Sequence, residues 1–493
     1  MAQVWPNAKH ETAKMRTAAA KRRMTNPPSM LSGAGANGSG RWLVKLGDWL
    51  FLAWVALIPV MQPNLTIFNR FSLQAADVVF VPAAVVYVAL LLSGKRQLRL
   101  TPLNRCAMAF LAALILSTCL SENRWQSFLK LLADTYLIFA AVMAESYIAN
   151  LEALRRTTLA WIAGTAVTIA AAAAGVMAFY YSLLLPAALR SSAATGPLGA
   201  IVEFSRNTFI DDYGTAPPGP YPRICACFLY ADGLCAYAIA SAMIVVAAHQ
   251  AGWIGRRTSQ ALFWGAAMAA LFSPSPGMGG LFLAMGLWYW RQKRSNPASS
   301  PHAGRYAASA GALAAVAFLL VATISPTPLR TSSVWETLRH PQPSVRDLTW
   351  TGAWRTFLSH PLFGRGLDLP EADVYYLAAS GEMHHQDDAH NTWLSIMAQA
   401  GLPATIAFAA IMLTLTRRFR WRSADSHPAL AALDLAFISG VLYPLLTASF
   451  ESTRHVWLMI ALVAAAHRVL DAESRKPPRA TCGPTRGRML TAT

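Results

Sequence analysis

The sequence is poor in charged residues. Only 13% of its 493 residues are Asp, Glu, Lys or Arg, whereas 55% are hydrophobic. Soluble domains carry about a quarter charged residues, so this shortage excludes an ordinary soluble domain. The short alternating segments that are typical of outer-membrane barrels are also lacking. The apolar surface is therefore expected to belong to membrane-spanning helices, which satisfy their backbone polar groups within each segment.

Cysteine is scarce, and the basic residues are dispersed. The six cysteines are scattered and include only a lone C-x-C at Cys225 and Cys227, which predicts neither a disulfide framework nor a metal site. The net charge of +18 is spread over short clusters, which argues against nucleic-acid binding. No apolar segment precedes about residue 48, so we expect the first helix to remain as an uncleaved anchor.

Long apolar runs predict an all-α, polytopic integral membrane protein with about twelve transmembrane helices. The basic residues concentrate in the N-terminal tail, in every second connection and in the C-terminal tail, a pattern that predicts both termini in the cytoplasm. The predicted spans are 48–62, 75–93, 106–120, 127–148, 157–185, 225–249, 259–273, 277–290, 306–325, 390–416, 428–449 and 455–470.

These spans divide the chain into a transmembrane domain, 48–470, and two basic cytoplasmic tails, 1–47 and 471–493, which we expect to be disordered. Two of the predicted outer loops are long, 186–224 and 326–389. Both are polar and rich in proline and glycine. Because binding and catalytic residues are concentrated on loops, we expect the chemistry there.

The second outer loop contains a predicted amphipathic helix. It runs from Arg346 to about Leu358 and has Leu348, Ala353 and Phe357 on its apolar face.

Two further motifs follow this helix. The segment Pro361-Leu-Phe-Gly364-Arg-Gly366 predicts a turn. His390-Asn391 then opens the next span, which carries Gly401 eleven residues after the histidine.

The three motifs, in this order, resemble the O-antigen ligase-related superfamily. This group contains O-antigen ligases, O-antigen and exopolysaccharide polymerases and some protein O-oligosaccharyltransferases. The motif block covers roughly 60 residues, and the predicted spans agree with the family over most of the chain. The sequence departs from the family twice: Ser275-Pro276-Gly277 stands where Ser-Arg-Gly is frequent, and Gln399 stands where glutamate often precedes the glycine.

The resemblance implies a GT-C-like membrane glycosyltransferase with a large extracytoplasmic loop, located in a bacterial inner membrane with that loop in the periplasm. It would move a glycan from undecaprenyl-pyrophosphate to an acceptor hydroxyl, with inversion and without a metal or other cofactor. With lipid A-core as acceptor the protein is an O-antigen ligase of lipopolysaccharide biosynthesis. With another lipid-linked repeat unit as acceptor it is an O-antigen or exopolysaccharide polymerase.

The reaction needs a base for the acceptor hydroxyl and positive charge for the pyrophosphate. His390 suits the first role because an ordinary histidine is mostly neutral at neutral pH. Arg346 and Arg223 suit the second because a guanidinium pairs bidentately with phosphate, and Arg365 is a further candidate. An ordinary structural role is the alternative for each of them, such as solvation, helix capping or anchoring at the membrane interface.

Other side chains of the loop are candidates for substrate binding. Asn391 would orient His390 or cap the helix, His385 would contact the glycan, and Trp350 would stack on a sugar or anchor at the interface. A divalent metal is an alternative use of two clusters. These clusters are His384, His385, Asp387, Asp388 and His390, and Glu371-x-Asp373.

Two other classes of function stay open. A transporter or flippase for lipid-linked glycans would need charged residues within its spans. The spans hold few, of which Lys130, Asp134, Glu145, Asp232 and Asp434 stand out. A catalytically silent scaffold is the third class, because the two departures remove a basic and an acidic group from the family pattern.

Overall fold

The structure is a computed structural model. It describes residues 38–62, 65–67, 71–184, 197–210, 222–273, 275–295, 345–377, 383–421, 423, 427–450 and 453–474. Residues 1–46 and 47–493 form separate units, and the candidate site lies wholly within the second. The described part of the first unit is only the beginning of one helix, α2.

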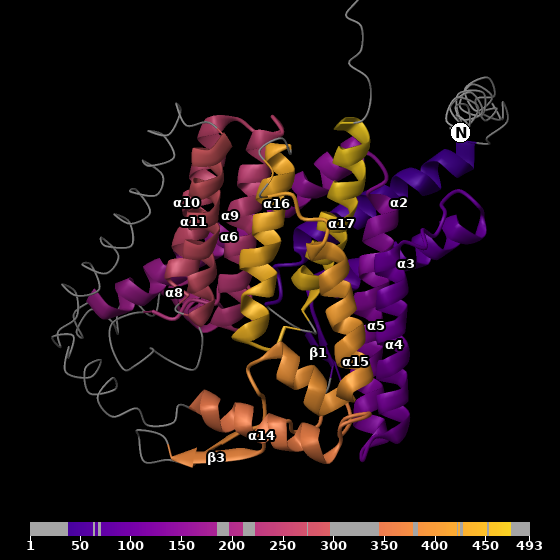
Figure 1. The fold of residues 1–493 in the computed structure, drawn as a ribbon. Coiled ribbons are helices and arrows are strands. Elements are labelled where there is room, and N and C mark those ends of the chain that lie inside the picture. Colours follow the sequence, from indigo (N-terminus) through magenta and orange to yellow (C-terminus); the bar gives the residue numbers. More distant parts are fainter. Residues whose placement is uncertain are drawn as a thin grey trace, which may run out of the picture. The chain divides into compact units, whose positions relative to one another are not determined.

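The described chain is mainly helical, as predicted (Figure 1). Its long helices are α2 (Gly38–Leu57), α3 (Ala75–Leu92), α4 (Pro102–Leu120), α5 (Arg124–Tyr147), α6 (Leu151–Leu184), α8 (Pro197–Phe209), α9 (Ala231–Gln250), α10 (Arg256–Leu271), α11 (Gly279–Ser295), α14 (Val345–Ser359), α15 (Thr392–Thr416), α16 (Pro428–Phe437) and α17 (Arg454–Ser474). A π-helix, η3 (Ile438–Leu442), and a 3-10 turn, η4 (Pro444–Leu446), continue α16, and a 3-10 turn, η1 (Pro276–Met278), precedes α11.

Eight of these helices are long and apolar enough to cross a membrane: α3, α4, α5, α6, α9, α15, α16 with its continuation, and α17. They confirm a polytopic helical membrane protein. The predicted spans 48–62, 259–273 and 277–290 correspond to α2, α10 and α11, which are helical but are not among the eight. The predicted span 306–325 lies outside the described residues. A total of twelve spans therefore stays a prediction.

Two short hairpins modify the all-α expectation. β1 (Leu65–Ile67) pairs with β2 (Phe71–Leu73), and β3 (Val374–Leu377) pairs with β4 (Met383–Gln386), both antiparallel. The second hairpin and α14 lie in the second predicted outer loop, and α8 lies in the first. Both loops therefore contain regular structure in their described parts.

Small residues let the central helices pack closely. In the most apolar stretch of α9, 83% of the residues are buried, whereas the corresponding share in α3 is 33%. Helix α9 therefore lies at the centre of the helices and α3 at their edge. At the contact of α9 with η3, a Cβ on Gly440 would lie 2.5 Å from that of Ala240. Alanine and glycine therefore set the spacing of these helices.

The predicted turn at Pro361–Gly366 closes a break in α15. The helix is interrupted at Gly401, whose φ of 74° and ψ of −170° are not helical. The Arg365 and Gly366 amides donate to the Ala398 and Gln399 carbonyls, and the Leu402 amide donates to the Pro361 carbonyl. Backbone groups freed by the break are thus satisfied by the turn, as apolar surroundings require.

The helix predicted within the second loop forms, but its buried face differs from the predicted one. Ala353 and Phe357 are buried in α14, as predicted, whereas Leu348 is 37% exposed and Thr349 takes the buried position. The Thr349 hydroxyl donates to the Arg346 and Ala389 carbonyls, so a polar side chain is satisfied there. Placing Leu348 on the apolar face was therefore wrong.

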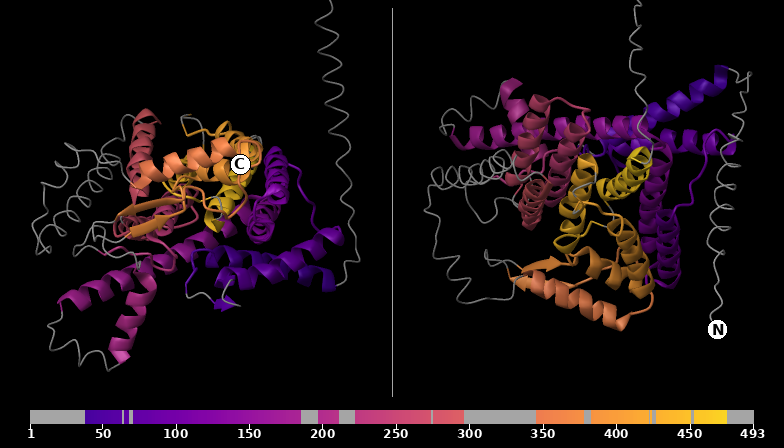
Figure 2. Two further views of the ribbon diagram at one scale, coloured as in Figure 1. Left: turned by 90° about the horizontal axis from the view of Figure 1, so that it is seen from below. Right: turned by 45° about the horizontal axis from the view of Figure 1, so that its top comes forward.

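The helix α14, the β3–β4 hairpin and the first turns of α15 form one group, here called the outer lobe. It is held by a small apolar cluster of Ala353, Ala389, Ala398 and Leu394. Figure 2 shows from two further sides that α14 lies against the hairpin. The outer lobe thereby surrounds the entrance of α15, where His390 stands.

The break in α15 gives a first testable prediction. Gly401→Ala should destabilise the protein by about 1–3 kcal/mol or more, because alanine disfavours this φ and its Cβ would lie 2.4 Å from the Leu362 carbonyl oxygen. The thermal unfolding midpoint of the protein in detergent measures this effect. Gly286→Ala in α11 is the control, because its Cβ would meet nothing within 4 Å. Equal midpoints for the two variants would contradict the proposed role of the break.

Candidate functional site

A histidine and a carboxylate face each other just before α15. The Nδ1 atom of His390 lies 3.4 Å from Oδ2 of Asp388, and the His390 amide donates to Oδ1 of Asp388 at 2.7 Å. The tight turn gives His390 a φ of 49°, a left-handed conformation that is uncommon for a residue other than glycine. Since Nδ1 faces the carboxylate, Nε2 is the nitrogen left for another group.

A second segment holds this turn in place. The Ser449 hydroxyl donates to Oδ1 of Asp388 at 2.6 Å. Thr392 donates through its amide and hydroxyl to the Ala448 carbonyl, and its hydroxyl accepts from the Phe450 amide at 2.8 Å. The connection between α16 and α17 is therefore fixed to the start of α15, and Ser449 orients the carboxylate that faces His390.

Asp388 and His390 each shift the pKa of the other. The bond to Asp388 raises the pKa of His390 above its ordinary value, against the lowering effect of burial. Burial acts to raise the pKa of Asp388, but its bonds to His390 and Ser449 hold that pKa below the ordinary value. Asp388 therefore stays a carboxylate and makes His390 a stronger base than a free histidine.

Charges from two further segments reach the same histidine. Asp232, in the first turn of α9, raises the pKa of His390, and Arg346, in the first turn of α14, lowers it. Arg223 joins this group because its Nη2 atom lies 3.9 Å from Oδ1 of Asp232. Of the three residues that the sequence suggested for catalysis, Arg346 thus acts on the pKa of His390, and Arg223 is connected to His390 only through Asp232.

Arg223 stands beside the first departure from the family motif. The Ile224 amide donates to the Phe272 carbonyl at 2.9 Å, where α10 ends. The chain continues from there through Ser275 and Pro276 into α11. The backbone next to Arg223 is therefore bonded to the end of α10, four residues before Pro276.

Glu371 stands beside the second departure. This buried carboxylate accepts hydrogen bonds from the Ala389 amide at 3.1 Å, the Ser395 hydroxyl at 2.6 Å and the Gln399 side-chain amide. Position 399 lacks the acidic residue of the family pattern, but the carboxylate of Glu371 is bonded to the Gln399 side chain. These bonds tie Glu371 to the residue that precedes His390.

The four residues suggested for substrate binding are in varied surroundings. Arg365 pairs with Glu122, with its Nε atom 2.9 Å from Oε2, and His385 pairs with Asp373 at 2.9 Å and stacks on Tyr375.

Asn391 caps α15 by accepting from the Trp393 and Leu394 amides. Trp350 is 37% exposed on α14. Hydrogen-bond and ion-pair contacts therefore join neither Arg365 nor His385 to His390, and the capping role of Asn391 is observed.

No group of three or more His, Cys, Asp and Glu side chains in the described residues is arranged to hold a metal ion. The sequence suggested two clusters as possible metal ligands. In the structure, Glu371 of one cluster accepts hydrogen bonds from three donors, and His385 of the other pairs with Asp373. The side chain of His384 lies outside the described residues.

A polar cavity adjoins the histidine–carboxylate pair. Its volume is about 260 Å³. It is lined by Lys130, Asp368, Leu369, Pro370, Glu371, Asp387, Asp388, Gln399 and Ser449. Asp388 and Ser449 are therefore shared between the cavity and the His390 pair.

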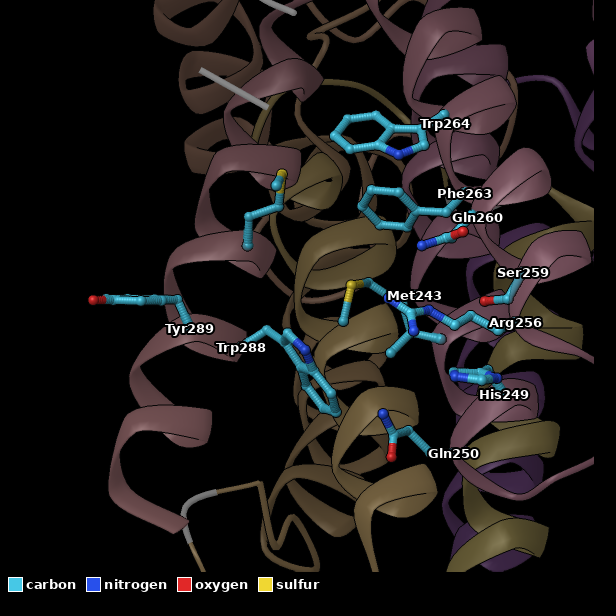
Figure 3. A pocket seen from close by; sticks show the side chains of 12 residues that line it. Met243, His249, Gln250, Arg256, Ser259, Gln260, Phe263, Trp264, Trp288 and Tyr289 are labelled. Atoms are coloured by element: carbon cyan, nitrogen blue, oxygen red, sulfur yellow. The ribbon is translucent and has the colours of Figure 1, made fainter. Parts of the chain in front are cut away.

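Another cavity, of about 150 Å³, lies between α9, α10 and α11 and has a mostly apolar and aromatic wall that includes Phe263, Trp264 and Trp288 (Figure 3). It shares no residue with the polar cavity.

The sequence pointed to Asp388 and Glu371 only as possible metal ligands, and it missed Ser449. The spacing Asp388-x-His390 was the available signal for the pair, because a carboxylate two residues before a histidine can close a tight turn onto it. Nothing local to Ser449 indicates that it reaches Asp388, since 61 residues separate them.

The fold and the site define a polytopic helical membrane protein in which a histidine–carboxylate pair lies at the start of a broken helix, with one arginine on α14 and another in the segment before α9. Residues 261–409 match the family model described as O-antigen ligase, which confirms the resemblance to the O-antigen ligase-related superfamily. The match supports ligase- or polymerase-type activity in O-antigen biosynthesis. The comparison with curated proteins gave no match.

The Asp388–His390 pair gives a second prediction. Asp388→Asn removes the charge that stabilises the imidazolium, so the pKa of His390 should fall towards or below its ordinary value. Diethyl pyrocarbonate modifies only the neutral imidazole, and mass spectrometry of the His390 peptide reports its reactivity against pH. The half-reactive pH should be lower in Asp388→Asn than in the wild type. An unchanged or higher value would show that Asp388 does not act on His390.

Proposed function

We propose that the protein is a membrane glycosyltransferase that moves a glycan from undecaprenyl-pyrophosphate to an acceptor hydroxyl in cell-surface polysaccharide biosynthesis. The observation that carries this proposal is the pairing of His390 with Asp388 among the charges of Arg346, Asp232 and Arg223. A base and two guanidinium groups are what the reaction requires, and they come from three segments that are distant in the chain. The match to the O-antigen ligase family supports the same class of reaction.

The proposed step forms and breaks one bond each. Nε2 of His390 takes the proton of the acceptor hydroxyl, whose oxygen attacks the anomeric carbon of the donor sugar. The bond from that carbon to the pyrophosphate oxygen breaks on the opposite face, so the configuration inverts. Asp388 stabilises the imidazolium, as the carboxylate of a triad does. Arg223 and Arg346 hold the undecaprenyl-pyrophosphate that leaves, so positive charge is supplied without a metal.

The two departures from the family pattern are compatible with an active enzyme. We propose that Arg223 supplies the positive charge that Pro276 lacks, because its neighbour Ile224 is bonded to the end of α10. We also propose that Glu371 supplies the acidic group that Gln399 lacks, since the two side chains are bonded. Both compensations weaken the case for a silent scaffold.

The acceptor decides between two activities of one site. With lipid A-core as acceptor the protein acts as an O-antigen ligase, and this is the function we propose first because the matched family carries that description. With the end of another lipid-linked repeat unit as acceptor, it acts as an O-antigen or exopolysaccharide polymerase.

The contacts of the charged residues within the spans favour an enzyme over a transporter. Glu145 pairs with Arg468 at 2.6 Å, and Asp434 pairs with His467 at 2.7 Å. Each pair joins α17 to another helix, so these charges are engaged in helix packing. Asp232 is directed to the site itself through Arg223. Glu145, Asp434 and Asp232 thus have partners that need no transport path.

Complementation of a deletion strain tests this function. His390→Ala and Arg346→Ala, at protein levels equal to the wild type, should each abolish surface glycan, a loss of at least about 100-fold because each removes a group that acts in the transition state. Gels of surface polysaccharide and of the lipid-linked pool provide the measurement. Accumulated long lipid-linked chains would identify a ligase, and accumulated single repeat units would identify a polymerase.

The controls are Arg355→Ala, on the exposed side of α14, and His360→Ala, just beyond its end. Both remove the same kinds of side chain from the outer lobe and should leave the glycan intact. Full glycan with His390→Ala and Arg346→Ala would overturn the catalytic assignment in favour of a transporter or scaffold.

A further inference from the structure

The polar cavity beside Asp388 is a candidate for a second part of the site. We infer that it is the subsite for the acceptor sugar, and that it takes a neutral, hydroxyl-rich residue or one that carries an amino group, and rejects an anionic sugar. This inference rests on the proposed glycosyl transfer and adds to it the chemical class of the acceptor and the residues that bind it.

The position of the cavity is the first argument. Asp388 and Ser449 belong both to its wall and to the pair that orients His390. A sugar in the cavity would therefore lie beside the pair, in contact with the Asp388 side chain.

The size of the cavity is the second argument. Its volume of about 260 Å³ is just below the ~300 Å³ at which pockets for drug-sized ligands begin. Such a space suits a single sugar residue, with the remainder of the glycan outside. Asp368 and Asp387 are exposed at its rim, whereas Glu371 and Gln399 are buried at its floor, so the cavity is open to a ligand from the outer lobe's surface.

The lining is the third argument. Polar groups face the cavity from five parts of the chain: Lys130 on α5, the segment after the glycine turn, the segment before His390, Gln399 on α15, and Ser449. A hydroxyl group both donates and accepts, so it can bond to carboxylates and to an ammonium group alike. Polar groups that converge on one small space are typical of a site that orients a hydroxylated ligand.

The charge of the lining decides which ligand it excludes. Four carboxylates, Asp368, Glu371, Asp387 and Asp388, stand against one lysine, Lys130. An anionic sugar or a pyrophosphate would be repelled by this excess of negative charge. Arg223 and Arg346 are absent from the lining. Arg346 acts on His390 from α14, and Arg223 pairs with Asp232 from the segment before α9. The donor pyrophosphate and the acceptor sugar are thereby assigned to differently charged surroundings of one histidine.

Kinetics with the purified full-length protein in nanodiscs test the inference. The donor is the lipid-linked glycan extracted from the deletion strain. The acceptor is the strain's own acceptor glycolipid, used untreated and with its primary hydroxyls oxidised to carboxylates. The variants are Asp387→Asn and Asp368→Asn at the rim. Glu203→Gln is the control because it removes an exposed carboxylate from α8, outside the cavity.

We expect each rim variant to raise the KM for the untreated acceptor about five- to tenfold, with the KM for the donor unchanged, because one charged hydrogen-bond acceptor is lost. The oxidised acceptor should be a poor substrate for the wild type and a better one for Asp387→Asn. Glu203→Gln should equal the wild type in each assay.

A rise in the KM for the donor, with the acceptor KM unchanged, would assign the cavity to the donor and overturn the inference. Unchanged KM values, or equal use of the two acceptors by the wild type, would also overturn it. Absence of any transfer by the wild type would instead overturn the proposed function, and the inference with it.

Discussion

The site depends on one constraint: a helix that breaks inside apolar surroundings must find partners for its freed backbone groups. Gly401 interrupts α15, and the turn at Pro361–Gly366 supplies those partners through three backbone hydrogen bonds. Gly364 is needed there because its φ is 68° and a Cβ would lie 2.2 Å from the Gln399 backbone. Two of the three sequence motifs therefore act first as structure, since they lock the outer lobe onto the helix whose mouth carries His390.

The contact between this turn and α15 also positions the side chains of the candidate site. The lobe brings Glu371 to the start of α15, where it accepts from the Ala389 amide and the Ser395 hydroxyl. The tight turn just before α15 places Asp388 against His390. Ser449, in the connection between α16 and α17, donates a hydrogen bond to this carboxylate. The strained φ of His390 is maintained by these bonds, as is typical of residues held for function. A strong base is thus fixed at the edge of a polar cavity.

The distribution of charged groups distinguishes the proposed acceptor side of the site from the proposed donor side. Carboxylates dominate the cavity beside Asp388, whereas the positive charge near His390 comes from Arg346 on α14, and Arg223 pairs with Asp232 from the segment before α9. An enzyme that joins a pyrophosphate-linked donor to a hydroxylated acceptor has to keep the two apart until they react. Opposite charge on two sides of a single histidine is a simple physical means to do so.

The sequence by itself determined the class of protein and suggested where the candidate site lies in the chain. Hydropathy predicted the eight described helices that are long and apolar enough to cross a membrane, because lipid demands long apolar helices whatever they pack against. Motifs suggested His390 and Arg346, and the pattern around Ala353 and Phe357 predicted α14, because each of these signals is contained in a few consecutive residues. Only the tertiary structure decided that Arg223 reaches Asp232, that Ser449 holds Asp388 and that Arg365 pairs with Glu122. The residues of the last two pairs are distant in sequence, and the contacts of all three depend on how separate helices pack, which no local pattern records.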